Sequence, residues 1–440
     1  MLLLAACGGN PVRNQAKPGN LSGQELAAGN NYIACPDSTN TTAQKPEKGP
    51  VTLTVSGWSA TPAEDELTQQ NLRAFEALHP SIKVNWSPIP GDYLTKMRAN
   101  VAGGTVPDAF YLQPAMSSQY ISAGKLLNLS PYMTRDGIKA DLYYPSLLKP
   151  FVCATGQVYG LPKDWSSLGV FYNKRLFQQA GVAFPAANWT WNDLQNDARK
   201  LTRNPGARKS VYGIVLSADL ARWGAFLLAE GGSVLNRAGT RATFNAQPGV
   251  RALQFYDSFF QQKSGAQPTT VGAAWSGDAF GKQRAAMVIE GSWLLPYLAS
   301  TYPGVQYGIA PLPTAPNGTR GNLSFTNAWS VYSGTKHPEA AWELVKYMTS
   351  AAVQESQLNA GFALPTLKSL ANAAYFSKHP DAKVLFAAAP YSSADYYGPL
   401  DTSIRANVAN AISAVLLGVQ DAQTALNDAA TKVDDELGSE

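Results

Sequence analysis

AAMVIEGSWLLPYL, at residues 285–298, is the stretch on which the interpretation of this chain rests. Its apolar beginning, residues 285–289, predicts a buried strand. The strand ends abruptly at Glu290-Gly291-Ser292-Trp293, where glycine permits a turn and allows a ligand to approach the backbone closely. The stretch therefore predicts a core strand that leads directly into a tryptophan at a turn.

A second stretch, YGIAPLPTAPNGTRGNLSFTNAWSVYSG at residues 307–334, completes the pattern. Pro311 to Pro313 mark one turn and Asn317-Gly318 marks another, before a second apolar run at residues 328–332. Trp329 lies in this run, so each stretch places a tryptophan where a polar turn meets a core strand. A large, rigid ring in such a position suits a flat ligand that also forms hydrogen bonds.

This order of motifs resembles the family 1 extracellular solute-binding proteins, the sugar-capturing components of ABC importers. That family shows a glycine–tryptophan turn after an "AAM" strand, then a "YG…PLP" segment and a strand that crosses between two lobes. Here these features are Gly291-Ser292-Trp293, residues 307–313 and about residues 324–333. The resemblance extends over roughly residues 51–437. It implies an α/β, two-lobed periplasmic-binding-protein-like (type II) fold with hinge strands and a ligand cleft between the lobes.

The region after residue 50 begins with strands and helices in alternation. Two helical patterns separate three short apolar runs, an order that predicts a parallel sheet with covering helices. The expected strands are Val51–Val55, Ile82–Trp86 and Pro107–Leu112, and the expected helices are Glu64–Leu78 and Tyr93–Val101.

The resemblance also predicts how the chain divides between the lobes. Residues 156–174 and 361–365 match the family's other crossings between the lobes. We therefore expect an N-terminal lobe of residues 51–164 and 327–360 and a C-terminal lobe of residues 165–326 and 361–440. Residues 8–50 are polar with few aromatic residues, which predicts a flexible tether.

Composition narrows the class of protein. The chain has 440 residues, 45% of them hydrophobic, which is enough for two or three domains. A net charge of +4 and the lack of a long Lys/Arg run argue against binding of nucleic acid. No apolar run reaches about 18 residues, so no membrane-spanning helix is expected.

The first residues, MLLLAACG, resemble the end of a bacterial lipoprotein signal peptide. Leu4-Ala5-Ala6-Cys7 fits the lipobox, so we expect a remnant of the signal at residues 1–7 and a lipid on Cys7. The basic region of such a signal is missing, which leaves the position of the true start codon open. The protein would then be held on the outer surface of the membrane, periplasmic or extracellular. A chance apolar start with a stray thiol is the alternative.

Cys35 and Cys153 are the two remaining cysteines. In an exported protein they predict a disulfide, which would attach the tether to the first lobe. Two free thiols are the alternative.

The residues offer no familiar catalytic or metal-binding motif. His79, His337 and His379 each precede a proline, and no H-E-x-x-H, C-x-x-C, EF-hand or G-x-S-x-G pattern occurs. Residues 277–282, GDAFGK, have only three residues between the glycines of a would-be phosphate loop. We therefore predict no cofactor, no metal and no enzymatic activity. A glycosidase needs only two carboxylates, and Glu290 and Asp164 remain candidates for such a catalytic pair.

The family's order of elements places a set of aromatic and polar residues near the cleft. Core positions are the alternative for the tryptophans, and a surface ion pair is the alternative for Arg405. The candidate ligand-binding residues are Trp58, Ser59, Tyr111, Gln113, Asp164, Trp165, Asp219, Trp223, Glu290, Gly291, Trp293, Asn327, Trp329 and Arg405. Trp86, Trp189, Trp191, Trp275 and Trp342 are interpreted as structural.

The resemblance implies a monomeric binding protein that captures a di- or oligosaccharide by hinge closure and delivers it to the transmembrane subunits of an ABC permease. A polyol phosphate such as glycerol 3-phosphate is the alternative ligand, and Lys163 and Arg405 are the obvious nearby cations for it. A carbohydrate-active enzyme and an interaction module, such as a receptor ectodomain, are the other hypotheses.

Overall fold

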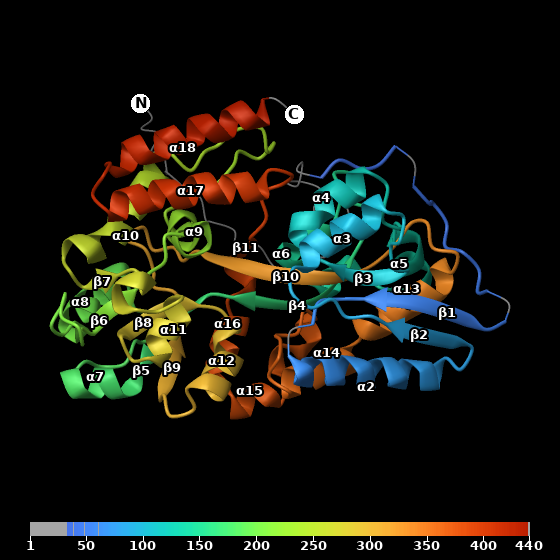
Figure 1. Ribbon diagram of the computed structural model, residues 1–440, viewed down its shortest axis with the longest axis horizontal. Coiled ribbons are helices and arrows are strands. Elements are labelled where there is room, and N and C mark those ends of the chain that lie inside the picture. Colours follow the sequence, from blue (N-terminus) through green and yellow to red (C-terminus); the bar gives the residue numbers. More distant parts are fainter. Residues whose placement is uncertain (1–32, 38, 48, 60, 439–440) are drawn as a thin grey trace, which may run out of the picture.

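Two sheets organise the computed structural model, which describes residues 33–37, 39–47, 49–59 and 61–438 (Figure 1). One sheet has the order β11-β10-β3-β1-β2, with β4 paired to β10, and the other has the order β7-β6-β8-β5-β9. Most of each sheet lies in one lobe, and the long strands β4 and β10 of the first sheet run between the lobes (Figure 1). Among the described residues, no helix is both long and apolar enough to span a bilayer.

The first lobe begins with the predicted alternation of strands and helices. Its elements are β1 (Val51–Ser56), α2 (Pro62–Leu78), β2 (Ile82–Trp86), α3 (Tyr93–Ala102) and β3 (Ala109–Leu112). In β1 the side chains are alternately buried and exposed, and Thr61 caps α2 by accepting from the backbone N–H of Glu64. Because β1 pairs in parallel with both β2 and β3, the predicted parallel sheet is confirmed.

The crossing strands β4 (Leu161–Ser167) and β10 (Asn322–Val331) are antiparallel to each other. Leu161 and Ala328 belong to the hydrophobic core of the first lobe, whereas Leu168 and Phe325 belong to or pack on that of the second. The change of core membership falls near residues 164 and 327, where the sequence suggested lobe boundaries. A third crossing follows α14 (Ala351–Asn359), since Trp165 donates its backbone N–H to the carbonyl of Leu364.

The second lobe is built around β8, which is buried along its whole length between β6 and β5. It pairs in parallel with β6 and antiparallel with β5. The strands are β5 (Gly169–Asn173), β6 (Tyr212–Val215), β7 (Gly265–Ala266), β8 (Ala285–Glu290) and β9 (Tyr307–Ala310). The helices are α7 (Lys174–Ala180), α8 (Trp191–Leu201), α9 (Leu220–Ala229), α10 (Gln247–Gln261), α11 (Ser276–Gly281), α12 (Leu294–Thr301), α17 (Asp401–Leu416) and α18 (Ala422–Leu437).

The segment after residue 360 does not belong wholly to the second lobe. Leu367 and Tyr396 are buried in the core of the first lobe, because the chain passes back along the crossing strands before it reaches α17. The other elements are α4 (Pro114–Ser122), α5 (Ser130–Asp136), α6 (Pro145–Leu148), α13 (Pro338–Met348), α15 (Tyr375–Lys378), α16 (Pro380–Phe386) and β11 (Ser392–Ala394). Trp342 on α13 is fully buried, as its interpretation as a structural residue requires.

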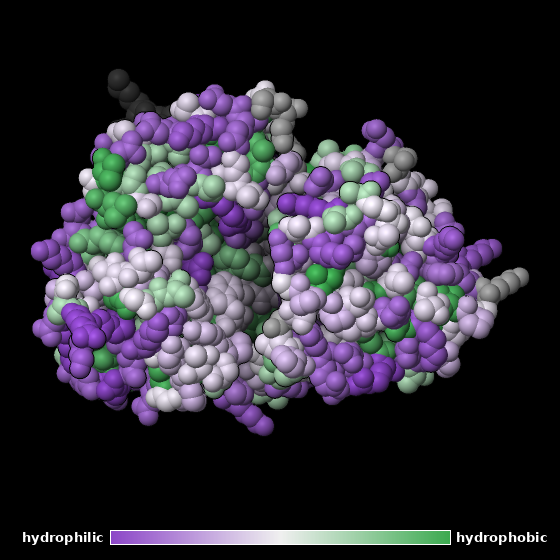
Figure 2. All heavy atoms as spheres, viewed as in Figure 1, coloured by the Kyte–Doolittle hydropathy of each residue, from purple (hydrophilic) through white to green (hydrophobic). Residues whose placement is uncertain are grey.

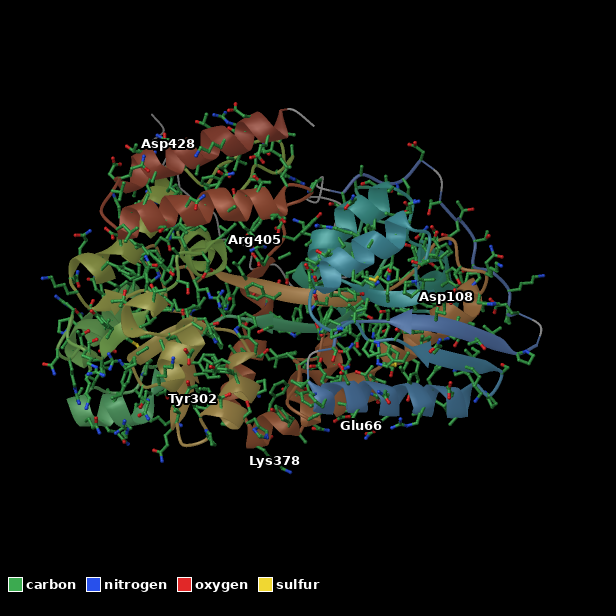
Figure 3. All side chains as sticks on the ribbon, viewed as in Figure 1. Glu66, Asp108, Tyr302, Lys378, Arg405 and Asp428 are labelled. Atoms are coloured by element: carbon green, nitrogen blue, oxygen red, sulfur yellow. A yellow bond between two sulfur atoms is a disulfide. The ribbon has the colours of Figure 1, made fainter. Side chains whose placement is uncertain are left out.

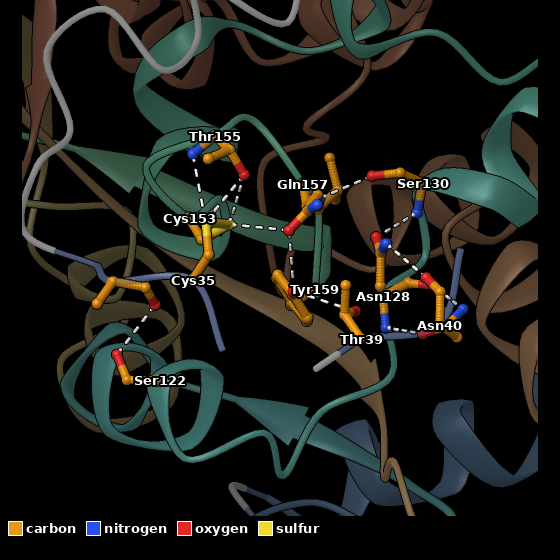
Figure 4. Close-up of a disulfide and its surroundings, with 12 residues drawn as sticks. Cys35, Thr39, Asn40, Ser122, Asn128, Ser130, Cys153, Thr155, Gln157 and Tyr159 are labelled. Atoms are coloured by element: carbon orange, nitrogen blue, oxygen red, sulfur yellow. Dashed lines mark hydrogen bonds between the residues drawn. A yellow bond between two sulfur atoms is a disulfide. The ribbon is translucent and has the colours of Figure 1, made fainter. Parts of the chain in front are cut away.

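The described part of the N-terminal segment lies against the first lobe, whereas we expected a free tether as far as residue 50 (Figure 4). A disulfide joins Cys35 to Cys153, and Ile33 is fully buried. Asn40 and Asn128 exchange hydrogen bonds of 2.9–3.0 Å through their side-chain amides and backbone groups. These long-range contacts order residues whose composition alone predicts disorder. Cys7 lies outside the described residues.

The disulfide can be checked by peptide mapping. Digestion without reduction should yield a peptide containing Cys35 linked to one containing Cys153. Reduction should then speed hydrogen exchange at Asn40 and Asn128, because the cross-link that holds the segment on the lobe is lost. Full alkylation of both thiols in the native, air-exposed protein would contradict the bond.

Candidate ligand-binding cleft

A hollow separates the two lobes (Figure 2). Part of it is a pocket of about 230 Å³ with residues of both lobes and of the crossing strand on its walls. Gln113 follows β3 in the first lobe, Asn327 lies on β10, and Arg405 lies on α17 in the second lobe. The pocket is lined by Gln113, Pro114, Ala115, Phe325, Thr326, Asn327, Asp395, Asp401 and Arg405.

Successive side chains of the crossing strands point to opposite faces of the β4–β10 pair. Asp164 pairs with Asn327, and Ser166 pairs with Phe325. Because directly paired residues share a face and alternate residues do too, these four side chains lie on one side of the β4–β10 pair, and two of them, Phe325 and Asn327, line the pocket. Asn327 donates to the Asp164 carboxylate at 3.0 Å. Trp165 lies on the opposite side.

A β-bulge in β4 places Lys163 against the aromatic residues of the first lobe. Asn327 pairs with Asp164 and Ala328 with Pro162, so Lys163 is the extra residue. Its ammonium lies 4.9 Å from the ring centre of Trp58 and 4.4 Å from that of Tyr111, and it forms an ion pair with Asp164.

Lys163 remains charged although its side chain is almost completely buried. Burial lowers the pKa of the ammonium, but Asp164, Tyr111 and Glu64 together outweigh it, so the pKa is raised overall. Burial also raises the pKa of Glu64, and the nearby charge of Lys163 opposes this rise.

Trp58 and Tyr111 meet edge to face at 4.6 Å, and Trp58 is half-buried. Ser59, beside Trp58, donates a hydrogen bond to Asp65. The first lobe thus presents an aromatic wall that is formed by the half-buried Trp58 and supported by the buried Tyr111 and the Lys163–Asp164 ion pair.

Trp293 is the aromatic residue of the second lobe that lies at the crossing strands. It is half-buried between β8 and α12, and its ring meets Phe325 of β10 edge to face at 5.2 Å. Its indole Nε1–H donates to Glu290 Oε2 at 2.8 Å. Arg222 donates to the same oxygen at 2.5 Å, and its guanidinium lies 5.7 Å from the ring centre of Trp293.

Glu290 is fully buried, which corrects the expectation that it accepts hydrogen bonds from a ligand at the rim. Burial raises the pKa of its carboxyl above the ordinary value, although Arg222 and the hydrogen bond from Trp293 oppose the rise. Asp219 caps α9 through the backbone N–H of Arg222, and about a third of its side chain is exposed. Asp219 therefore remains available to a ligand, whereas Glu290 is occupied by protein donors.

Gly291 is required by the packing of Trp293. A Cβ atom at this position would lie 2.3 Å from the ring of Trp293 and 2.6 Å from Ser166 Oγ, which accepts the backbone N–H of Ser292. Such distances are far below van der Waals contact, so the ring can occupy its position only beside glycine.

Gly291→Ala should displace the Trp293 ring and weaken binding of a saccharide by at least about tenfold. Calorimetric titration measures the effect, and tryptophan fluorescence of the free protein reports the displacement. Gly304→Ala serves as the matched control, because a Cβ there meets no atom within 4 Å. Unchanged affinity in Gly291→Ala would show that the ring does not contact the saccharide.

Arg405 both lines the pocket and forms ion pairs. The sequence left two interpretations of this residue, a ligand contact and a surface ion pair, and its position is compatible with both. It contacts Asp401 at 2.7 Å and Asp395 at 3.0 Å, and it lies at the gap between the lobes (Figure 3). Burial raises the pKa of Asp395, and Arg405 opposes that rise. Neither acidic residue was among the sequence candidates.

Three candidate tryptophans lie in cores. Trp165 donates its indole N–H to the carbonyl of Pro365 at 2.9 Å and packs on Phe386. Trp223 is fully buried in the second lobe. Trp329 is fully buried beneath Tyr111, with ring centres 4.5 Å apart, because β10 begins at Asn322 and Trp329 is therefore well inside the strand. We do not carry these three residues into the proposed site.

The structure thus gathers Trp58, Gln113, Asp164 and Asn327 on the side of the first lobe, whereas Tyr111 is buried against Trp58. Asp219, Trp293 and Arg405 lie on the side of the second. The sequence reasoning did not propose Ser166, Arg222 or Phe325. The two-residue period would have found Ser166 from Asp164 and Phe325 from Asn327.

Within residues 33–438, leaving out positions 38, 48 and 60, no three His, Cys, Asp or Glu side chains are grouped as a metal ion would require. The cationic groups at the cleft are paired with carboxylates. Lys163 pairs with Asp164, Arg222 with Glu290, and Arg405 with Asp395 and Asp401.

Comparison with known proteins agrees with this architecture. The family model for bacterial extracellular solute-binding proteins matches residues 59–355. A protein from Brucella abortus that is named a binding protein is 28% identical over 399 residues, 89% of this chain and 94% of that protein. A maltooligosaccharide ABC transporter solute-binding lipoprotein from Streptococcus pneumoniae is 27% identical over 281 residues, 60% of each chain. The cyclic α-maltosyl-1,6-maltose binding protein of Arthrobacter globiformis shares the fold, with a TM-score of 0.78, 22% identity, and coverage of 89% of this chain and 100% of that one.

Proposed function

The chain belongs to the bacterial extracellular solute-binding proteins, and on that premise we propose that it captures a neutral di- or oligosaccharide between its lobes. The observation that carries the proposal is the pair of half-buried tryptophans, Trp58 and Trp293, one in each lobe. Carboxylate and amide groups of the crossing strands lie next to both lobes. The saccharides named for the relatives support the same class of ligand.

This combination of groups suits a sugar. The C–H face of a pyranose packs on an aromatic ring, while its hydroxyls need acceptors and donors around the edge. Asp164, Asp219 and Asn327 provide these groups and are only partly buried. Binding sites for small molecules typically join apolar walls to a few placed polar groups in this way.

Binding by closure of the lobes follows from the position of the crossing strands. β4 and β10 connect the two cores near Asp164 and Asn327, so a small rotation there moves one aromatic wall toward the other. A saccharide that touches both walls binds the closed state better than the open one. That difference in affinity is what can drive closure.

The charges of the cleft favour a neutral saccharide over a polyol phosphate. A phosphate needs free cations or convergent N–H donors. Lys163, Arg222 and Arg405 are each already paired with carboxylates, so an added phosphate would meet an acidic surface. We also propose that the protein is not an enzyme, since the buried Glu290 is held by Arg222 and Trp293 and has no access to a glycosidic bond.

A thermal-shift panel tests the function. Maltose, maltotriose, maltotetraose, a cyclic maltodextrin and other neutral oligosaccharides should be compared with glycerol 3-phosphate. Binding to the folded state raises the melting temperature by mass action, so at least one neutral saccharide should raise it and glycerol 3-phosphate should not. A shift with glycerol 3-phosphate alone would overturn the assignment. Hydrolysis of the bound saccharide would show an enzyme instead.

Within the family's function, we expect this monomeric protein to deliver its sugar to the membrane subunits of an ABC permease while tethered by a lipid on Cys7. The lipobox Leu4-Ala5-Ala6-Cys7 and the lipoprotein name of the pneumococcal relative support the anchor. One lipid chain alone binds a membrane only weakly, so the anchor of such a protein needs more than one chain.

Cys7→Ala in the full-length precursor should move the protein from the membrane to the soluble fraction. Fractionation followed by detection of the protein measures this, with Cys35→Ala as the control that keeps the lipobox intact. If Cys7→Ala remains with the membrane to the same extent as the wild-type protein, the lipid anchor is wrong.

A further inference from the structure

We propose that Glu290 and Arg222 are positioning residues that hold the Trp293 ring in its ligand-binding orientation without touching the saccharide. The proposal rests on the function proposed above, because it takes Trp293 as the sugar-contacting ring of the second lobe. It assigns to the two charged residues a role that differs from direct hydrogen bonding to a sugar.

The geometry centres on a single oxygen atom. Glu290 Oε2 accepts both the indole N–H of Trp293 at 2.8 Å and the guanidinium of Arg222 at 2.5 Å. Glu290 Oε1 is buried and has no hydrogen-bond partner among the described residues. The two donors to Oε2 therefore account for the polar contacts of this side chain, and removing either leaves a buried carboxylate poorly satisfied.

Four neighbours restrict the Trp293 ring. The hydrogen bond at Nε1 fixes the edge of the indole, and the Arg222 guanidinium lies 5.7 Å from its centre. The backbone of Gly291 allows the ring to approach closely, and Phe325 meets it edge to face. A ring that is restricted in this way before a sugar arrives loses less conformational entropy on binding, which strengthens the complex.

The supporting residues are themselves held by regular elements rather than by a mobile loop. Glu290 is the last residue of the buried strand β8. Arg222 lies in the first turn of α9, where its backbone N–H donates to the capping residue Asp219 and its side chain lies 3.6 Å from the Asp219 carboxylate. The orientation of Trp293 is thus set by a strand and a helix that are far apart in sequence.

A double-mutant cycle tests the proposal. Affinity is measured for whichever neutral saccharide of the panel most raises the melting temperature, in wild-type, Glu290→Gln, Trp293→Phe and double-variant proteins. Phenylalanine keeps an aromatic ring but lacks the N–H. Glu290→Gln should weaken binding about tenfold in the wild-type background and less than about threefold in the Trp293→Phe background, since the interaction between neighbouring residues is what the cycle isolates. Equal losses in both backgrounds would overturn the proposal.

The orientation of the ring can be read without any saccharide. In protein with ¹⁵N-labelled tryptophan, the Trp293 indole resonance is the one that disappears in Trp293→Phe. Glu290→Gln should shift this resonance and speed its exchange with water. Glu230→Gln is the matched control, because it removes another carboxylate of the second lobe that an arginine, Arg251, contacts at 2.7 Å at the end of α9. It should leave both the resonance and the affinity unchanged.

The two measurements separate the possible failures. If no saccharide binds the wild-type protein, the proposed function fails, whatever the resonance does, and the positioning role falls with it. If a saccharide binds but Glu290→Gln changes neither the indole resonance nor the affinity, only the positioning role is wrong. If Glu230→Gln reproduces both effects, the changes reflect lost stability and the positioning role is likewise wrong.

Discussion

Arg222→Ala should lower the free energy of unfolding by about 3 kcal/mol at neutral pH, the largest stability effect that we expect from a single substitution at the cleft. The Glu290 side chain is only 1% exposed, and Arg222 is its cationic partner. Removing Arg222 leaves a buried carboxylate whose remaining donor is the indole N–H of Trp293. Denaturation with urea, followed by circular dichroism, measures the loss.

The loss should depend on pH. The pKa of Glu290 is raised in the folded protein, so the folded state binds the proton more tightly than the unfolded chain. Stability from this group is therefore fully present below its unfolded pKa and is lost as the pH rises through the folded pKa. Arg222 lowers the folded pKa of Glu290, so its removal increases the free-energy cost of burying the ionised carboxylate at neutral pH. Protonation of Glu290 in acid should remove most of this cost.

Arg251→Ala is the control for this prediction. Arg251 forms an ion pair with Glu230 in the same lobe, but half of its side chain is exposed, so its loss should cost no more than about 1 kcal/mol. If Arg222→Ala lowers the free energy of unfolding by the same amount at about pH 7 and about pH 4.5, the prediction that Glu290 is ionised and buried is contradicted. Arg251→Ala should show the same small loss at both pH values.

Trp293→Ala should weaken saccharide binding by roughly 2 kcal/mol or more, the effect expected of a central contact residue. The half-buried ring meets Phe325 of the crossing strand, where we propose that a saccharide stacks between the lobes. Calorimetric titration gives the affinity, and the melting temperature of the free protein gives the structural effect. A large drop in melting temperature with near-normal affinity would show that Trp293 is a core residue.

Trp189→Ala provides the matched comparison. Trp189 is 3% exposed, and its indole N–H donates to the carbonyl of Pro311, so it is a buried tryptophan with one hydrogen bond in the same lobe. Its truncation should cost about 3–5 kcal/mol of stability. Measured below the melting temperature of the variant, its saccharide affinity should stay near that of the wild-type protein. Binding losses of the same size in both variants would indicate that affinity only follows stability.

Much of the first lobe was predictable because its signals are local. The strand at Ile82–Trp86 and the helix that ends at Leu78 follow from residue spacing within single turns and from the proline after His79. Thr190 and Asp193 in the second lobe form a capping box at the start of α8, another feature that lies within four consecutive residues. Such features depend on residues within a few positions of each other.

The candidate site was harder to predict because exposure is not local. Trp293 and Trp329 occupy similar places in the sequence pattern, each next to a turn and an apolar run. One is half-buried at the crossing strands, and the other is fully buried beneath Tyr111. The difference arises from where β10 begins and from which strand lies beside it, and neither is readable from a short window of residues.

The sequence by itself determined the family, because the order of its motifs resembles that of the family 1 solute-binding proteins, and this resemblance implied the two-lobed α/β architecture and the crossing strands. Only the tertiary structure decided which tryptophans are buried in the cores and that Glu290 is buried against Arg222, 68 residues away. It also decided that residues 33–37 and 39–47 pack on the first lobe. The physical reason is that burial and charge pairing depend on contacts between distant segments, which form only when the sheets and helices have packed.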